Sequence, residues 1–182
     1  MNLIFRLVKV LIAACCRARI DLFDESRLNL RVWPTDLDVN LHLTNSRYLS
    51  MMDLGRMDWL ARGGYLPHMI RERWQPLVGS CTIRFRRPIS PFQTFELRTR
   101  LLCWDDKWLY VEQRFIANNE LAALAFVKGL LRGPQGNIPM PDLLAAIGHP
   151  GAISPEPPDA IVDWQHMEAD LSDALAAEKS AA

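Results

Sequence analysis

Polar and apolar residues alternate along residues 27–32, a pattern typical of a strand with one buried face. From residue 45 to residue 62 the apolar residues take up helical spacing, and Gly63 and Gly64 end the helix. Because apolar residues surround most of its circumference, we expect this helix to be buried. Gly55 in its middle costs about 1 kcal/mol relative to alanine, so we expect a close backbone approach there.

Strand-like alternation returns after Pro76 and continues to residue 131. It predicts four strands, near residues 81–85, 95–103, 108–117 and 121–131, with tight turns at 105–107 and 118–119. We expect these strands to form an antiparallel meander, with the almost continuously apolar last strand in the interior. The order of strand, long helix and meander predicts an α+β domain in which an antiparallel sheet wraps around one central helix.

Two segments flank this domain, which we place at residues 25–140. Residues 1–24 form an apolar and basic N-terminal helix. Residues 141–182 form a proline-rich tail with a short amphipathic helix. The apolar positions of that last helix are Ile161, Trp164, Met167, Leu171 and Leu175.

The first sixteen residues are mostly apolar, with Arg6 and Lys9 interrupting them and no acidic residue before Asp21. They fall short of the roughly 20 apolar residues that a membrane-spanning helix needs. Three interpretations remain open: peripheral membrane contact through residues 1–20, a helix packed on the domain or on a partner subunit, and a secretory signal.

The composition and the absence of common motifs argue against several classes of function. The 21 basic residues balance the 21 acidic ones among 182 residues, which argues against a nucleic-acid partner. Four cysteines without zinc-site spacing favour reduced thiols in a cytoplasmic protein. Serine-hydrolase, zinc-peptidase and nucleotide-binding motifs are absent from the sequence, so we expect no metal and no cofactor.

Residues 36–48 hold the densest group of reactive side chains: Asp36, Asp38, Asn40, His42, Asn45 and Tyr48. They lie on the loop that leads into the buried helix. The first amides of a helix are unpaired and its dipole favours negative charge, so an oxyanion would be stabilised there. A carboxylate or imidazole just before the helix can activate water or attack an acyl carbon. The same residue types are also ordinary capping and turn residues.

This segment resembles the signature of hotdog-fold thioesterases of the 4-hydroxybenzoyl-CoA thioesterase superfamily, D-x-D-x-x-x-H-x-N-N-x-x-Y. The stretch DLDVNLH followed by TN is similar to the active loop of plant acyl-ACP thioesterases. The segments WDDKWLYVEQRF and VKGLLRGPQGNIP resemble bacterial acyl-CoA thioesterase-like proteins and the family of thioesterase superfamily member 6. The resemblance covers roughly residues 25–140 and implies a hotdog fold.

The resemblance also implies roles for individual residues. Asp38 would be the general base or nucleophile, Asn40 and His42 would orient it, and the backbone N–H near Asn45 would polarise the thioester carbonyl. Asp36 would shape the loop. Substrate-binding residues would be Tyr48, Met52, Arg86 and Arg87, the arginines as a phosphate clamp for coenzyme A. Arginines at these strand positions are also typical of a solvated sheet face.

The sequence departs from the family pattern at three places. Leu41 stands where a glycine often precedes the histidine, Thr44 replaces the first asparagine of the pair, and residues 84–87 lack an acidic residue that acyl-ACP thioesterases carry. The missing acidic residue concerns the mechanism of acyl-ACP thioesterases more than the fold.

The function that the resemblance implies is a cytoplasmic thioester hydrolase of fatty acid metabolism, acting on acyl-CoA or acyl-carrier substrates. It would work as a homodimer or homotetramer, with the site at the subunit interface, and could lie at the inner membrane. One alternative is a non-catalytic acyl- or lipid-binding hotdog module associated with the membrane surface. Another is a hydratase or dehydratase, since hotdog folds host those activities too.

Overall fold

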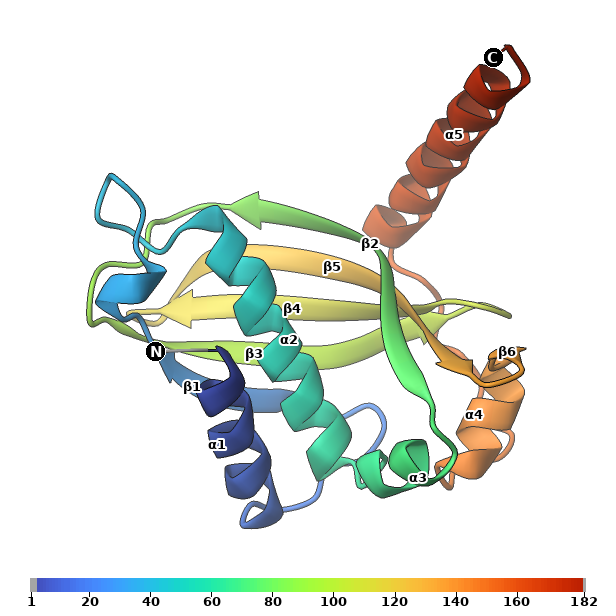
Figure 1. Cartoon of the computed structure of the whole chain (residues 1–182), viewed down its shortest axis with the longest axis horizontal. Helices are drawn as coiled ribbons and strands as arrows, with labels where there is room; N and C mark the ends of the chain where they lie inside the picture. Colours follow the sequence, from blue (N-terminus) through green and yellow to red (C-terminus); the bar gives the residue numbers. More distant parts are fainter. Residues whose placement is uncertain (1–2, 182) are drawn as a thin grey trace.

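Figure 1 shows the computed structural model of the chain, which describes residues 3–181, with 175–177 and 179–181 described by their backbone alone. A curled antiparallel sheet forms its centre, and helix α2 (Asn45–Arg62) lies across one face of the sheet. The strands are β1 (Ser26–Arg31), β2 (Gln75–Phe85), β3 (Thr94–Trp104), β4 (Leu109–Ala117), β5 (Glu120–Gly133) and the short β6 (Gly136–Asn137). The predicted α+β class, the helix over 45–62 and all five long strands are confirmed.

The order of the long strands in the sheet is β1-β3-β4-β5-β2. Only β3, β4 and β5 form a meander, so the prediction of four consecutive antiparallel strands is wrong for β2. That strand pairs with β5, for example Phe85 with Ala123, while β1 occupies the place beside β3 through pairs such as Leu28 with Leu97. The apolar strand β5 is paired on both sides, as expected for an interior strand.

Helix α2 packs against the sheet through one face. At Gly55 an added Cβ would lie 2.7 Å from Thr99 Oγ1 and 2.8 Å from Gln113 Nε2, so glycine lets the helix backbone approach the side chains of β3 and β4 closely. The helix is less enclosed than its composition predicts, because Leu49 on its outer side is 48% exposed.

Helix α1 (Leu3–Cys15) lies beside α2 (Figure 1) and buries Arg6, Val10 and Ala14. The inner face of α1 therefore packs on the domain, as one of the three interpretations of this segment predicts. Within the described part of the chain, no helix has the length and apolar character needed to cross a membrane.

Three further helices follow or connect the sheet. Helix α3 (Leu66–Arg71) follows α2, and α4 (Met140–Ala146) adds Met140, Leu143 and Leu144 to the main core. Helix α5 (Asp159–Ala181) is longer than the predicted short helix, and in Figure 1 it projects away from the domain. Ile161 and Trp164 pack beside Tyr110 and Cys103, whereas Met167 and Leu171 are more than half exposed. The side chain of Leu175, the last apolar position of the predicted helix, lies outside the described residues.

Candidate active site

Three of the predicted catalytic residues, Asp38, Asn40 and His42, lie on a closed loop between a short 3-10 helix (Pro34–Asp36) and α2, and Asn45 is the first residue of α2. Leu37 and Leu43 form an isolated antiparallel bridge, and the Asp38 N–H donates to the His42 carbonyl at 2.9 Å. At the loop tip Leu41 has a φ of 58°, the left-handed region that glycine adopts at least cost. Leu41 therefore holds a backbone conformation that costs more for leucine than it would for glycine.

The Asp38 carboxylate is held by its own loop. Its Oδ1 atom accepts the N–H of Asn40 at 2.9 Å and the N–H of His42 at 3.2 Å. No donor from the described residues lies within hydrogen-bond distance of the second carboxylate oxygen. The carboxylate is therefore oriented through one oxygen, while the other has no donor among the described residues.

The N-terminus of α2 has no side-chain cap. Thr44 occupies the capping position, but its side chain makes no capping hydrogen bond, and its own N–H donates to the Asp36 carbonyl at 2.9 Å. The Arg47 N–H donates to the Thr44 carbonyl at 2.8 Å, so the amides that lack the partner a capping serine or aspartate supplies are those of Asn45 and Ser46. These amides and the helix dipole together favour negative charge at this point.

Asp36 anchors the start of the loop. Its carboxylate accepts the Trp33 N–H at 2.9 Å, pairs with Arg47 at 3.5 Å, and forms a buried ion pair with Arg6 of α1. Because these partners occupy Asp36, the side chain shapes the loop, as the sequence predicts.

A groove of about 300 Å³ opens at this end of α2. It is lined by Asp38, His42, Leu43, Asn45, Tyr48, Phe85, Arg86, Arg87 and Pro88. Six of the eight predicted site residues thus lie together. The other two do not line it: Asn40 is exposed at the loop tip, and Met52 is 1% exposed in the core.

Sequence reasoning missed three groove residues, Leu43, Phe85 and Pro88. Phe85 ends strand β2 and Pro88 follows closely after it, so the end of the alternating pattern of β2 is the only local signal of their position. Phe85 packs edge-on against Tyr48, with ring centroids 4.9 Å apart.

Tyr48 is 2% exposed, and burial raises its pKa to about 12. The phenol therefore stays neutral near pH 7 and packs as a wall of the groove.

The two arginines of the groove differ in their partners. Arg87 pairs with Glu120 at 2.8 Å, whereas Arg86 has no carboxylate of the described residues within salt-bridge distance. Both backbone N–H groups donate to the Ala122 carbonyl, at 2.8 and 3.1 Å, which fixes this segment at the end of β2. The groove thus has a carboxylate on its loop side and an unpaired cation on its strand side.

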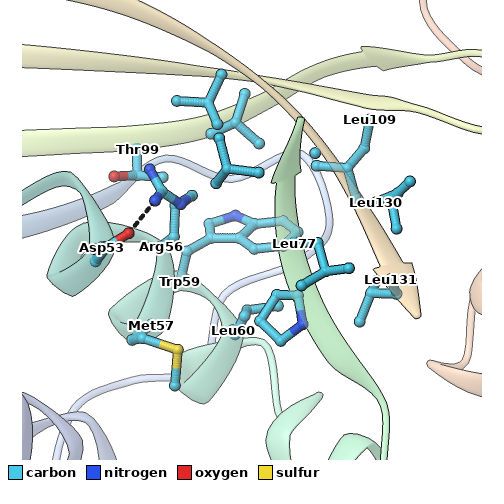
Figure 2. Close-up of a pocket in the computed structure, with 15 residues that line it drawn as sticks. Asp53, Arg56, Met57, Trp59, Leu60, Leu77, Thr99, Leu109, Leu130 and Leu131 are labelled. Atoms are coloured by element: carbon cyan, nitrogen blue, oxygen red, sulfur yellow. Dashed lines mark hydrogen bonds and ion pairs between the residues drawn. The ribbon is translucent and has the colours of Figure 1, made fainter. Parts of the chain in front are cut away.

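A second, largely apolar cavity of about 220 Å³ lies farther along α2, between that helix and strands β2 to β5. Figure 2 shows Trp59, Met57 and Leu60 of α2 across from Leu77, Leu109, Leu130 and Leu131 of the strands. An ion pair between Asp53 and Arg56 lies at its edge, and burial lowers the pKa of Arg56. Of the α2 methionines, Met57 lines this cavity, whereas Met51 and the predicted substrate-binding residue Met52 lie in the core.

Among the described residues, no three His, Cys, Asp or Glu side chains are grouped so as to hold a metal ion.

Comparisons of the sequence and of the structure with known proteins point to the same family. A family model described as the thioesterase-like superfamily matches residues 32–148. Protein THEM6 of Xenopus laevis is 38% identical over 161 residues, which cover 87% of this chain and 75% of that protein. A probable thioesterase of Saccharomyces cerevisiae is 27% identical over 130 residues, which cover 69% of this chain and 56% of the yeast protein.

A solved gentisyl-coenzyme A thioesterase superposes with a TM-score of 0.61 at 20% identity, over 66% of this chain and 99% of that chain. The sheet order and the central helix described above account for this likeness. The chain therefore belongs to the thioesterase-like superfamily, and its fold is the hotdog fold of those proteins.

Proposed function

We propose that this chain hydrolyses the thioester of an acyl-CoA, or of a related acyl carrier, in the groove at the N-terminus of α2. The observation that carries this proposal is that an oriented carboxylate, Asp38, and the uncapped amides of a helix line one groove. Neither feature alone requires catalysis. Together they supply the base and the oxyanion donors that thioester hydrolysis needs.

As general base, Asp38 takes a proton from water through its second oxygen while the water oxygen attacks the thioester carbonyl carbon. The carbonyl oxygen becomes an oxyanion, which the first amides of α2, near Asn45, stabilise. The C–S bond then breaks, and the proton on Asp38 passes to the departing thiolate. As nucleophile, the Asp38 carboxylate would instead attack the carbonyl carbon, the C–S bond would break with release of the thiolate, and water would hydrolyse the resulting acyl anhydride in a second step.

His42 and Asn40 support the carboxylate in this scheme through their backbone N–H groups, which donate to Asp38 Oδ1. His42 also lines the groove. Tyr48 and Phe85 form an apolar wall for the start of the acyl chain, with Met52 behind them in the core.

Arg86 and Arg87 would bind the phosphates of coenzyme A at the rim of the groove. Phosphate recognition by arginine needs exposed guanidinium groups without internal carboxylate partners, which Arg86 satisfies better than Arg87. The name of the gentisyl-coenzyme A thioesterase is consistent with a coenzyme A thioester as substrate.

The distal part of the acyl group would extend along α2 toward the cavity that Met57 and Trp59 line. Asn45 and Trp59 are fourteen residues apart, about 21 Å along a helix axis, so a fatty acyl chain could span this path. Such a substrate would place the protein in fatty acid metabolism.

A homodimer, or a homotetramer built from it, would complete the site. Strand β2 is an edge of the sheet and exposes Leu77, Val78 and Phe85, and exposed apolar edges are normally covered by pairing. Because β2 also contributes Phe85 to the groove, a partner at this edge would close the acyl path.

All four cysteines are free thiols, which supports a reducing compartment such as the cytoplasm.

The experiment that tests the proposal is thiol release from short-chain, long-chain and aromatic acyl-CoAs by the full chain. We expect turnover, with the preferred acyl group identifying the substrate class. Saturable binding of acyl-CoA without thiol release from any substrate would instead favour the non-catalytic acyl-binding module.

A further inference from the structure

The outer side of helix α1 is apolar and exposed. Phe5, Val8 and Ile12 are 69%, 49% and 64% exposed, and Ile4 shares this side. Their spacing of three and four residues places them on one stripe, opposite the buried side formed by Arg6, Val10 and Ala14. Contiguous apolar surface of this kind marks a site of association.

A basic groove borders this stripe. It lies between α1 and the outer edge of β1, has a volume of about 430 Å³, and is lined by Arg6, Lys9, Val10, Ala13, Leu28, Asn29, Leu30, Arg31, Trp33 and Thr94. No carboxylate is among these residues. Of the cations, Arg6 is engaged with Asp36, but neither Lys9 nor Arg31 forms a salt bridge with any described residue.

Arg31 is held in position at the mouth of the groove. Its Nε atom donates to the Phe92 carbonyl at 2.8 Å, and its guanidinium lies 5.6 Å from the Trp33 ring centroid and 5.8 Å from that of Phe92. Both rings belong to partly exposed side chains. A fixed cation flanked by exposed aromatic rings suits the phosphate level of a lipid surface.

We propose that α1 is a docking helix for an anionic phospholipid bilayer. The apolar stripe would enter the boundary between head groups and acyl chains, while Lys9 and Arg31 would contact lipid phosphates. The helix, with 13 residues and a length of about 20 Å, can lie in the surface but cannot cross the bilayer.

Charge complementarity selects a bilayer over a second copy of the chain. Residues 3–20 contain basic side chains and no acidic one. A two-fold contact through the stripe would bring Lys9 near its own counterpart without a carboxylate from either helix to pair with it. Anionic head groups neutralise the same cations. Helix α1 also lies outside the segment that the thioesterase-like family model matches, and none of its residues lines the groove of the proposed reaction.

The test is flotation of the full chain with vesicles, either of phosphatidylcholine alone or of phosphatidylcholine mixed with phosphatidylglycerol. We expect binding to the anionic vesicles that weakens as salt is added. The double variant Phe5→Gln/Ile12→Gln should lose about tenfold or more in vesicle affinity, and Lys9→Glu roughly fivefold or more. The matched control is Ile70→Gln on α3, since Ile70 is 76% exposed and distant in sequence from α1, and it should bind like wild type.

Three outcomes would overturn the proposal. The first is that the wild-type chain does not bind the anionic vesicles. The second is that the double variant binds like wild type while its circular dichroism and thermal midpoint match wild type. The third is that Ile70→Gln loses as much vesicle affinity as the double variant. Light scattering without lipid measures the mass in solution and tests whether a second copy of the chain covers the stripe instead. An oligomeric wild-type chain together with a monomeric double variant would assign the stripe to a second copy of the chain. None of these readouts depends on turnover.

Discussion

Arg6 of α1 and Asp36 of the active loop form an ion pair in which both side chains are almost completely buried, at 4% and 1% exposure. Asp36 also accepts the Trp33 N–H, and its carbonyl accepts the Thr44 N–H at the start of α2. The N-terminal helix is thereby tied to both ends of the loop that carries Asp38. The same helix presents the proposed membrane-docking stripe on its opposite side.

Replacing Arg6 should destabilise the protein strongly. Arg6→Met leaves the buried Asp36 carboxylate with only the more distant Arg47, at 3.5 Å, as a charged partner, which costs up to about 3–5 kcal/mol. Urea unfolding would measure this loss. The control is Arg27→Met, because Arg27 is 57% exposed and its pair with Glu25 should contribute about 1 kcal/mol or less. Equal losses in the two variants would contradict the anchoring role of Arg6.

Gly55→Ala tests the close packing of α2 on the sheet. The added methyl would lie within 2.8 Å of side-chain atoms of Thr99, Gln113 and Leu97, so we expect a loss of about 1–3 kcal/mol despite the better helix propensity of alanine. Thermal or urea unfolding gives the value. Ser50→Ala, also on α2, should change stability by about 0.5 kcal/mol or less. A stabilised Gly55→Ala protein would show that the helix is not held as close as described.

Arg86→Ala tests the proposed phosphate contact. With acyl-CoA we expect KM to rise roughly fivefold with little change in kcat, because the lost contact is to a remote part of the substrate. With the same acyl group on N-acetylcysteamine, which lacks the nucleotide, KM should not change. Arg84→Ala is the matched control, since Arg84 is an exposed arginine of β2 that does not line the groove. An equal rise in KM with both thioesters would argue against a phosphate clamp.

Alkaline titration tests the buried tyrosines. Burial raises the pKa of Tyr48, Tyr65 and Tyr110 to about 12, above the value of 10.0 for an exposed phenol. The unfolded chain releases these protons first, so the stability they contribute is complete below pH 10 and declines as the pH rises toward 12. Absorbance at 295 nm should show little phenolate in the native protein at a pH where the urea-unfolded protein is half ionised. Native ionisation near pH 10 would contradict the burial.

The local signals in the sequence predict much of this fold. The bounds of α2 follow from helical spacing and from Gly63 and Gly64, and the strands follow from alternation, since both depend on neighbouring residues alone. The partner of β2 could not be predicted in this way, because strand pairing joins residues far apart in the chain and alternation is the same for any partner.

The same distinction holds for the candidate site. Asp38, His42 and Asn45 share one short segment whose residue types point to chemistry, and the structure brings them to one groove. Phe85 enters that groove from β2, and Arg6 reaches Asp36 across thirty positions, so neither contact leaves a local pattern. The positive φ of Leu41 could not be predicted from the residue type either, because leucine rarely adopts this backbone conformation, whereas glycine often does.

The most direct test of the account is the rate of thiol release by Asp38→Asn, measured beside Asp106→Asn on an exposed hairpin turn. The asparagine keeps the shape of the loop and an acceptor oxygen but cannot take a proton from water. We expect kcat to fall about 10²–10⁴-fold while acyl-CoA still binds and the thermal midpoint stays near wild type. Asp106→Asn should turn over like wild type. A folded Asp38→Asn protein that retains wild-type kcat would contradict the central claim that Asp38 drives the hydrolysis.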